Sequence, residues 1–245
     1  MHAHSTLVPL RQPAMDATHT SFVTRRLRSS DSSMLAPALR MRAEVFGLEL
    51  GWVPYPANGH EWDRCDPLAY HFTLFATDGA STRLAGYARV LVPPSNFMLE
   101  REFVRLLANE PLQYSRETTF EVSRFVIHPG WRGKRDRDGR SAVDHLGRAI
   151  VQWALSNNRS LWLSVCEARH VRALRSRGLE FERFGAVVEY QPGVHACAAR
   201  LDLACAMERM RTDRAAQLEW YCATTPYAAH RRLEIQSITE GSSCD

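Results

Sequence analysis

The chain has 245 residues, of which 45% are hydrophobic and 24% are charged, values typical of a soluble globular protein. No apolar run approaches the roughly 20 residues that a membrane-spanning helix needs. The net charge is only +4, and there is neither a helix-turn-helix pattern nor a basic strip interleaved with aromatic residues, which argues against nucleic acid as a partner.

Six cysteines are scattered along the chain: Cys65, Cys166, Cys197, Cys205, Cys222 and Cys244. None forms a C-x-x-C pair, and no His–Cys cluster has the spacing of a zinc site. We therefore expect no structural metal, and we expect the cysteines to be reduced in a cytoplasmic protein.

No internal repeat or low-complexity linker divides the sequence. This predicts one domain over residues 21–225, preceded by a flexible extension (1–20) and followed by a tail (226–245).

In the first half of the domain, residues 29–31 offer N-cap side chains, and apolar residues then recur at helical spacing on a stripe that also carries Arg42. A long loop, residues 57–67, follows and contains three acidic residues; loops of this length are usually functional or disordered. Alternation predicts strands at 70–77 and 84–92, joined by a hairpin-like turn at Asp78–Gly79. Residues 102–108 form a short predicted helix.

The second half begins with a strand over residues 119–127, ended by Pro129 and Gly130. An S-x-x-D capping box at Ser141 and Asp144 starts a helix, and Gly178 ends a basic helix over 168–177. Strands are predicted at 161–165, 186–190 and 199–203, and an amphipathic helix at 206–221. This order predicts an α/β fold with a mixed, twisted central sheet and helices on both faces. An acyltransferase of the N-acetyltransferase (GNAT) superfamily satisfies it. A doubly wound nucleotide fold fits less well, because no Gly-rich loop follows a strand.

Two opposite charges, Glu121 and Arg124, interrupt the apolar strand 119–127. A charge in a core strand is costly unless it is paired or used. Three positions apart, the two side chains would lie on opposite faces of a regular strand. Either a bulge redirects one of them, or each meets a different partner.

Six charged residues stand in apolar or aromatic surroundings: Arg42, Asp63, Asp66, Arg89, Glu121 and Arg124. The aromatic residues near them in sequence are Phe46, Trp52, Trp62 and Phe103. Such a set suits a small cationic ligand that carries a carboxylate: acids meet the cation, arginines bind the carboxylate, and rings cover a sulfonium or a flat base. The alternative is that the six charges only brace the sheet.

The spacing of these residues resembles that of the acyl-homoserine lactone synthases, which make quorum-sensing signals. The matching positions are Arg42-x-x-Val45-Phe46, Trp52, Asp63-x-x-Asp66, Gly86-x-x-Arg89, Phe103 and Glu121-x-Ser123-Arg124-Phe125. The resemblance runs from about Arg26 to Gly185.

The resemblance implies that the amine of S-adenosylmethionine attacks an acyl thioester on acyl carrier protein or coenzyme A. Lactone closure then releases methylthioadenosine, with no metal or redox cofactor. It implies these roles: Glu121, Ser123 and Arg124 catalytic; Arg42, Phe46, Trp52, Asp63, Asp66, Arg89 and Phe103 around S-adenosylmethionine; Phe125, Val126 and Ser164 along the acyl group. Of these, Glu121 is the expected proton acceptor, and a backbone N–H near Phe125 or Val126 the expected donor to the thioester oxygen.

Other readings stay open. A serine such as Ser164 in a strand fits an ordinary bond to the backbone equally well. The rival enzyme is another GNAT-fold acyltransferase, such as an N-acyl amino acid synthase, and the rival outside enzymology is a non-catalytic protein that binds acyl carrier protein. His60, His71 and His128 are not expected to be bases, because none belongs to the matched pattern.

An acidic carrier protein has a predicted docking site in basic residues of two segments: Arg132, Lys134, Arg135, Arg172 and Arg175. The alternative is a solvated helix face.

Overall fold

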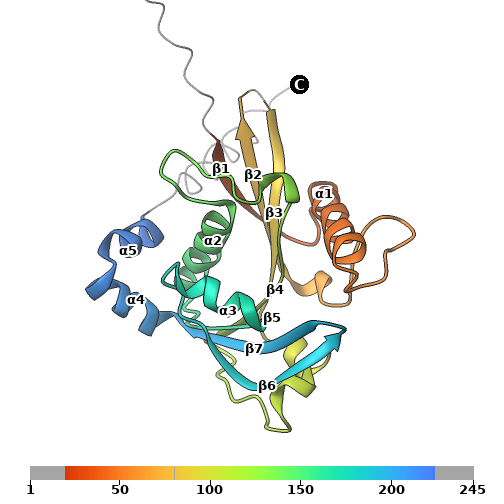
Figure 1. Ribbon diagram of the computed structural model, residues 1–245, viewed down its shortest axis with the longest axis vertical. Coiled ribbons are helices and arrows are strands. Elements are labelled where there is room, and N and C mark those ends of the chain that lie inside the picture. The colour runs from red at the N-terminus through yellow and green to blue at the C-terminus, as the bar shows by residue number, and fades with distance from the viewer. Residues whose placement is uncertain (1–19, 80, 224–245) are drawn as a thin grey trace, which may run out of the picture.

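A seven-stranded mixed sheet organises the computed structural model, which describes residues 20–79 and 81–223 (Figure 1). The strands are β1 (Ser21–Leu27), β2 (Tyr70–Asp78), β3 (Ser81–Leu91), β4 (Thr119–Ile127), β5 (Leu161–Glu167), β6 (Glu182–Gln191) and β7 (Val194–Asp202). Their spatial order is β1-β2-β3-β4-β5-β7-β6. β4 and β5 are parallel, and the other neighbouring pairs in this sheet are antiparallel.

Helices cover both faces of the sheet, as predicted. They are α1 (Ser32–Arg42), which continues as a π-helical segment η1 (Ala43–Glu49), α2 (Ala142–Ser156), α3 (Ala168–Arg175), α4 (Leu203–Asp213) and α5 (Ala215–Cys222). Short 3₁₀ turns are η2 (Asp66–Leu68), η3 (Met98–Glu100), η4 (Val104–Leu107) and η5 (Pro129–Trp131). α2 packs on β1, β2 and β3, whereas α1 packs on β3 and η4 on β6 and β7. No helix in the described ranges is long and apolar enough to cross a membrane.

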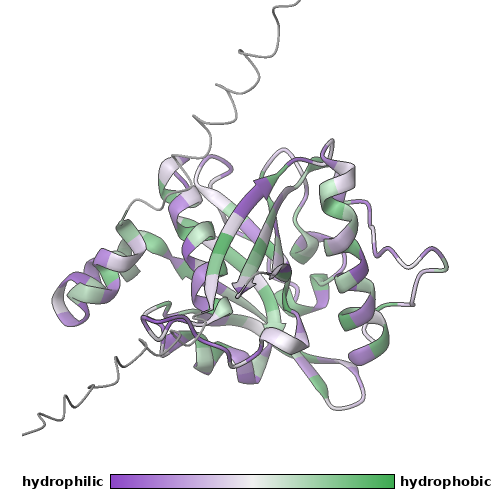
Figure 2. Cartoon of the chain, turned by 90° about the horizontal axis from the view of Figure 1, so that it is seen from above, coloured by the Kyte–Doolittle hydropathy of each residue, from purple (hydrophilic) through white to green (hydrophobic). Residues whose placement is uncertain are grey.

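Alternation along the strands builds separate cores on the two faces of the sheet. On β5, Trp162 joins the core that includes α2, whereas Leu163 joins the core that includes η3 and η4. A third cluster joins α1 and η1 to Tyr87 and Val126. In Figure 2 the central strands are largely green, and the surrounding helices are a mixture of purple and green.

Several sequence predictions hold at the level of single caps. Ser141 and Asp144 form the predicted capping box at the start of α2. Gly178 follows the end of α3 with φ +78°, a conformation that glycine adopts without strain.

Other predictions are wrong in extent. The strand β1 was not predicted, because its seven residues include a basic pair, Arg25 and Arg26, at an edge of the sheet. The helix predicted at 206–221 is broken at Arg214, whose extended φ of −146° separates α4 from α5. At 102–108 only the short turn η4 forms. β6 is longer than the predicted strand 186–190 at both ends, and β7 begins at Val194, well before the predicted start at 199. Apart from Thr20, the predicted extensions 1–20 and 226–245 lie outside the described residues.

The parallel pair β4–β5 separates halfway along. Its register ends at Val122 and Ser164, after which β4 continues beside β3, and β5 beside β7. The charged part of β4 therefore begins where this strand leaves β5.

Candidate active site

A bulge in β4 puts the predicted catalytic residues on one face. Ser123 lies opposite Arg89 and Val126 opposite Tyr87, so Arg124 and Phe125 together oppose a single residue of β3. Arg124 has φ +54°, which a bulge or turn can impose on a non-glycine residue. The extra residue shifts the alternation, so that Ser123 and Arg124 both face the segment that carries Asp63.

Arg42, from the end of α1, holds two acids of the loop before β2. Its Nε donates to Glu61, and its Nη1 and Nη2 donate to the two oxygens of Asp66 at 2.7 and 3.1 Å. Arg42 and Asp66 are fully buried. Burial opposes ionisation of Asp66, but the hydrogen bonds and charge of Arg42 and the charge of Arg89 outweigh it and lower the pKa of Asp66 to about 2.

Arg89 and Arg124 close the network from β3 and β4. Arg89 donates to Asp63 and, at 3.0 Å, to Ser123 Oγ, and its Nη1 lies 3.0 Å from Asp66 Oδ1. Arg124 donates to Glu61 at 2.9 Å and to Asp63 at 3.0 Å. Three arginines and three carboxylates therefore form one neutral cluster, which can be buried without net charge.

Exposure divides the cluster. The side chains of Arg42, Arg89 and Asp66 are 0% exposed, whereas those of Arg124 and Asp63 are 15% and 24% exposed. The buried three bind one another and also Glu61, Asp63 and Ser123, and so hold the loop against β3 and β4. Asp63 and Arg124 are the members that a ligand can reach.

Glu121 lies apart from this cluster and binds backbone. Its carboxylate accepts the N–H groups of Met98 and Leu99 at 2.6 and 3.2 Å, at the start of η3. The side chain is almost fully buried, and burial raises its pKa to about 8 although these two bonds favour the ionised form. A carboxyl group with this pKa can gain or lose a proton near neutral pH.

The predicted aromatic wall is only partly assembled. Phe46 and Trp52 stack with ring centroids 5.9 Å apart, and Arg124 lies over the Phe46 ring at 5.7 Å. Phe103 instead packs edge-on against Tyr190, with ring centroids 5.3 Å apart, in the core that includes η4.

The three predicted acyl-binding residues do not share one face. Phe125 packs against the core that includes α2, whereas Val126 is buried in the cluster with Phe46. Ser164 Oγ donates to the carbonyl of Val122 at 2.9 Å, at the last position where β4 and β5 pair. In this structure the hydroxyl therefore makes the backbone bond that was the alternative to an acyl contact.

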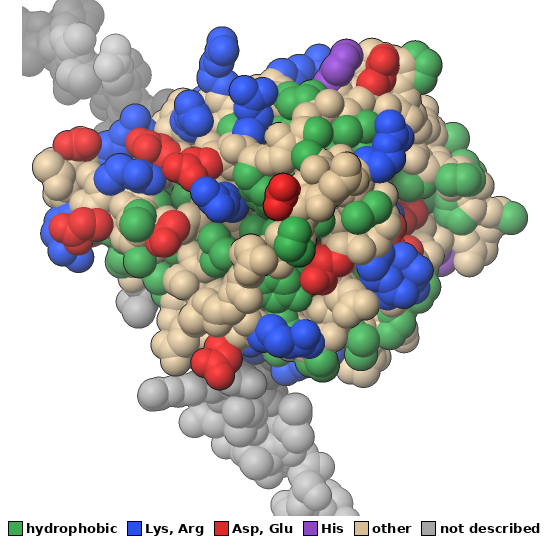
Figure 3. Space-filling model, turned by 90° about the horizontal axis from the view of Figure 1, so that it is seen from below, with side chains coloured by type: hydrophobic (Ala, Val, Ile, Leu, Met, Phe, Trp, Pro, Cys, Tyr) green, Lys and Arg blue, Asp and Glu red, His purple; other side chains and the backbone are tan. Residues whose placement is uncertain are grey.

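The basic residues predicted to dock a carrier lie on two separate parts of the molecule. Arg132 pairs with Glu49, and Lys134 with Asp78 at the end of β2. Arg172 and Arg175 lie on α3, which packs on β6 and β7 in Figure 1, away from the loop between η5 and α2 that carries Arg132 and Lys134. Figure 3 views the molecule from below and shows basic side chains interspersed with acidic ones.

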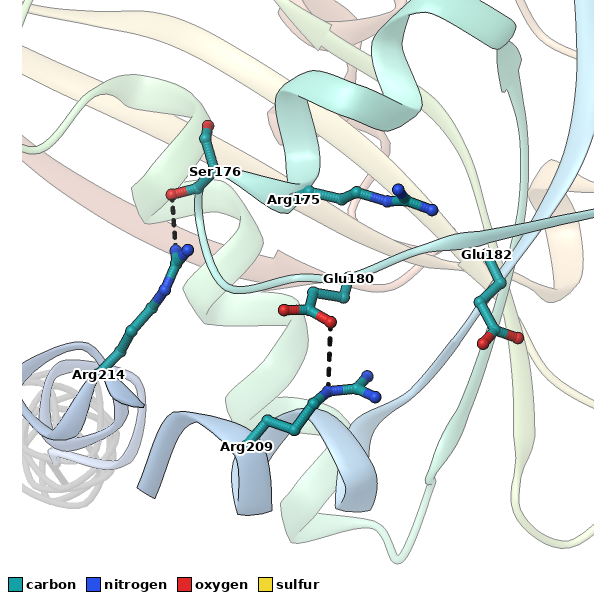
Figure 4. Close-up of a pocket in the computed structure, with 6 residues that line it drawn as sticks. All are labelled: Arg175, Ser176, Glu180, Glu182, Arg209 and Arg214. Carbon is teal, nitrogen blue, oxygen red and sulfur yellow. Dashed lines mark hydrogen bonds and ion pairs between the residues drawn. The ribbon is translucent and has the colours of Figure 1, made fainter. Parts of the chain in front are cut away.

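Two hollows adjoin α3. A volume of about 340 Å³ is lined by Ala168, Arg169, Val171, Arg172, Arg175 and Arg183. The other, about 490 Å³, is lined by Arg175, Ser176, Glu180, Glu182, Arg209 and Arg214. Figure 4 shows that Arg209 pairs with Glu180 in the second hollow, where Arg214 donates to Ser176. The first hollow is lined by four arginines, of which Arg169 pairs with Glu167 at 2.7 Å, and no carboxylate lines it, so it suits an anion better than the second hollow does.

The sequence pattern does not identify Glu61 as a member of the cluster. Its position among the three acids of loop 57–67 is the signal that points to it, but a loop has no periodicity that shows which acid points inward. Within the described ranges, no three His, Cys, Asp or Glu residues gather as a metal site would require.

Comparisons with known proteins define the class. A model of the autoinducer synthase family matches residues 26–211. The chain is 33% identical over 155 residues to an acyl-homoserine-lactone synthase of Rhizobium radiobacter, covering 63% of this chain and 72% of that protein. It is 26% identical over 160 residues to the acyl-homoserine-lactone synthase of Pseudomonas aeruginosa, covering 65% and 78%.

Solved structures agree on the fold. The AHL synthase LasI superposes with a TM-score of 0.61 at 24% identity, over 76% of this chain and 91% of that one. BjaI, a CoA-dependent acyl-homoserine lactone synthase solved with SAM and isopentyl-CoA, gives a TM-score of 0.63 at 17% identity, over 78% and 90%. The sheet, its bulged strand and the charged cluster thus belong to an acyltransferase with a GNAT-like fold. More particularly, the chain belongs to the autoinducer synthase family and is an acyl-homoserine-lactone synthase.

Proposed function

We propose that this synthase joins an acyl thioester to S-adenosylmethionine. The amine nitrogen attacks the thioester carbonyl, an N–C bond forms, the C–S bond breaks, and the thiol leaves with a proton. The carboxylate oxygen of the adenosylmethionine then attacks its own γ-carbon, and neutral methylthioadenosine departs with the electron pair of the C–S bond. These two steps balance in atoms and electrons without a metal or redox cofactor.

The partly exposed pair Asp63 and Arg124 is the observation that carries this proposal. An acid and an arginine that reach solvent together, beside the Phe46–Trp52 stack, match a ligand with an ammonium group, a carboxylate and a sulfonium. Glu121 would accept the proton of the amine, because the amine must be neutral to attack. Arg42, Asp66 and Arg89 hold Asp63 and Arg124 in place, Arg42 through Glu61.

Product analysis tests the reaction. Purified enzyme is incubated with S-adenosylmethionine and a series of acyl-carrier and acyl-coenzyme A thioesters, and the products are identified by mass spectrometry. We expect an acyl-homoserine lactone and methylthioadenosine in equal amounts. An acylated amino acid without methylthioadenosine would identify an N-acyl amino acid synthase, and carrier binding without turnover would indicate a binding protein.

We further propose that the acidic acyl carrier protein docks on the surface around the arginine-lined hollow beside α3. Charge reversal of both Arg172 and Arg175 to Glu should raise the KM for the acyl carrier at least about ten-fold, because steering by charge is lost. The KM for S-adenosylmethionine should not change. The matched control reverses Lys134 and Arg135 in the other predicted segment. Activity that is insensitive to salt and equal in both double variants would contradict docking at α3.

A further inference from the structure

A buried hydrogen-bonded chain lies behind Arg42 and joins β2 to β3. His71 Nδ1 is 2.7 Å from the hydroxyl oxygen of Tyr87, and Arg42 Nη1 donates to the same oxygen at 3.2 Å. At the other end of the ring, His71 Nε2 is 3.1 Å from the carbonyl of Asp66 and 3.2 Å from Ser29 Oγ. His71 and Tyr87 are both 0% exposed.

Groups that can only donate or only accept determine the direction of these hydrogen bonds. Arginine has no acceptor, so the Tyr87 oxygen must accept from Arg42. The Asp66 carbonyl can only accept, so the ring proton of neutral His71 lies on Nε2, 3.1 Å from that oxygen. His71 Nδ1 is then unprotonated and accepts from the Tyr87 hydroxyl.

The surroundings of His71 favour this neutral form. Burial, together with the nearby charges of Arg42 and Arg89, lowers the pKa of His71 to about 4, although the charge of Asp66 and the hydrogen bond to its carbonyl oppose this shift. A proton on Nδ1 would force the Tyr87 oxygen to face two donors. The half-exposed ring of Trp62 stacks on His71, with centroids 6.3 Å apart and planes 17° apart.

We propose that Tyr87 and His71 are positioning residues of the synthase: they hold the Arg42 guanidinium so that it sets Glu61, Asp66 and, through these, the ligand-facing Asp63 and Arg124. This role rests on the proposed site for S-adenosylmethionine. The link to Asp63 is direct, because its N–H donates to Asp66 Oδ2 at 2.7 Å. Both side chains are fully buried, so neither reaches the surface that a substrate would meet. Each acts on the substrate site only through Arg42 and the loop of residues 61–66.

The kinetic test uses Tyr87→Phe, which removes one buried oxygen and leaves the ring. Its matched control is Tyr221→Phe, the same change at a fully buried tyrosine of α5 whose hydroxyl donates to the Arg177 carbonyl at 3.4 Å. We expect Tyr87→Phe to raise the KM for S-adenosylmethionine about ten-fold, with the KM for the acyl thioester unchanged. Tyr221→Phe should change neither. Equal kinetic constants in the two variants would overturn the proposal.

Substitutions at His71 separate packing from hydrogen bonding. His71→Asn keeps an acceptor for the Tyr87 hydroxyl, whereas His71→Phe keeps a ring without one. The Asn variant should keep a KM for S-adenosylmethionine close to that of the wild type, whereas the Phe variant should show a raised KM. The reverse order would show that only the ring shape matters.

Two measurements need no substrate, and so remain informative if the assigned substrates are wrong. Ring ¹⁵N shifts should show His71 as the neutral Nε2–H form from pH 6 to 8, and an Nδ1–H form would overturn the proton directions. Amide exchange at Asp63 and Cys65 should become at least about ten-fold faster in Tyr87→Phe than in Tyr221→Phe. Equal exchange rates would show that the hydrogen bonds of Tyr87 and His71 do not position the loop of residues 61–66.

Discussion

At the scale of single residues, the three arginines of the cluster are chemically identical but have different surroundings. Arg42 and Arg124 each share both of their acids with another arginine, but the Arg42 side chain is fully buried whereas the Arg124 side chain is partly exposed. Removing Arg42 would leave Asp66 with one remaining arginine in a fully buried site. Removing Arg124 would leave Glu61 with Arg42 and Asp63 with Arg89, and solvent could reach the partly exposed Asp63.

We therefore expect Arg42→Met to lower the free energy of unfolding by about 3–5 kcal/mol, as when one partner of a buried ion pair is deleted. Arg124→Met should lower it by only about 1–3 kcal/mol, the cost of lost hydrogen bonds to charged groups. Its kcat/KM should fall at least about 100-fold, because it faces the ligand. Urea unfolding and steady-state kinetics on both variants check this. A stable Arg124→Met enzyme of normal activity would remove Arg124 from the ligand site.

The charged residues also show how far sequence reasoning reaches at this scale. The spacing identified five of the six cluster members, because charges in apolar strands and stripes stand out. It did not identify Glu61, which lies in a loop, and it counted Glu121 with the cluster although that carboxylate binds the backbone of η3. Pairing depends on side-chain geometry that only the folded chain determines.

At the scale of elements, periodicity predicted the strands and helices whose apolar residues face a core. It missed β1, an edge strand with a basic pair, and it joined α4 to α5 because apolar spacing continues across Arg214. For β4 the sequence admits two alternatives, a bulge or separate partners for Glu121 and Arg124, and does not decide between them. The position of Arg124 at φ +54° depends on contacts with Glu61 and Asp63, which are about 60 residues away in the sequence.

Close packing of β6 on η4 gives a prediction at this scale. Gly185 has φ +64°, and a Cβ there would lie 2.0 Å from the Leu106 carbonyl oxygen. Gly185→Ala should therefore lower the free energy of unfolding by at least about 3 kcal/mol, since the backbone of η4 must move. The control is Gly193→Ala in the β6–β7 turn, where φ is +77° but nothing lies within 4 Å. It should cost only about 1–2 kcal/mol, the strain of a left-handed alanine. Equal losses in urea unfolding would mean that η4 is not tightly packed.

At the scale of the whole molecule, two buried groups on the same side of the sheet give stability opposite dependences on pH. The pKa of Glu121 is raised from 4.5 to about 8, so its stabilising contribution is present below pH 4.5 and is lost as pH rises through 8. The pKa of His71 is lowered from 6.5 to about 4, so its contribution is present above pH 6.5 and is lost as pH falls through 4. Asp66, with its pKa lowered from 3.8 to about 2, adds a further loss in stronger acid.

The two slopes cancel between pH 4.5 and 6.5, where the free energy of unfolding should be nearly flat. From pH 6.5 to 8 only Glu121 among these groups still changes, and at about 1.4 kcal/mol per pH unit for one proton the loss should be about 2 kcal/mol. Urea unfolding across this range measures the curve. In Glu121→Gln the alkaline decline should disappear while the acid decline remains, because glutamine does not titrate and His71 is unchanged. A wild-type enzyme that keeps constant stability from pH 6.5 to 8 would contradict a raised pKa of Glu121, and would mean that the Met98 and Leu99 N–H groups keep this carboxyl group ionised throughout the range.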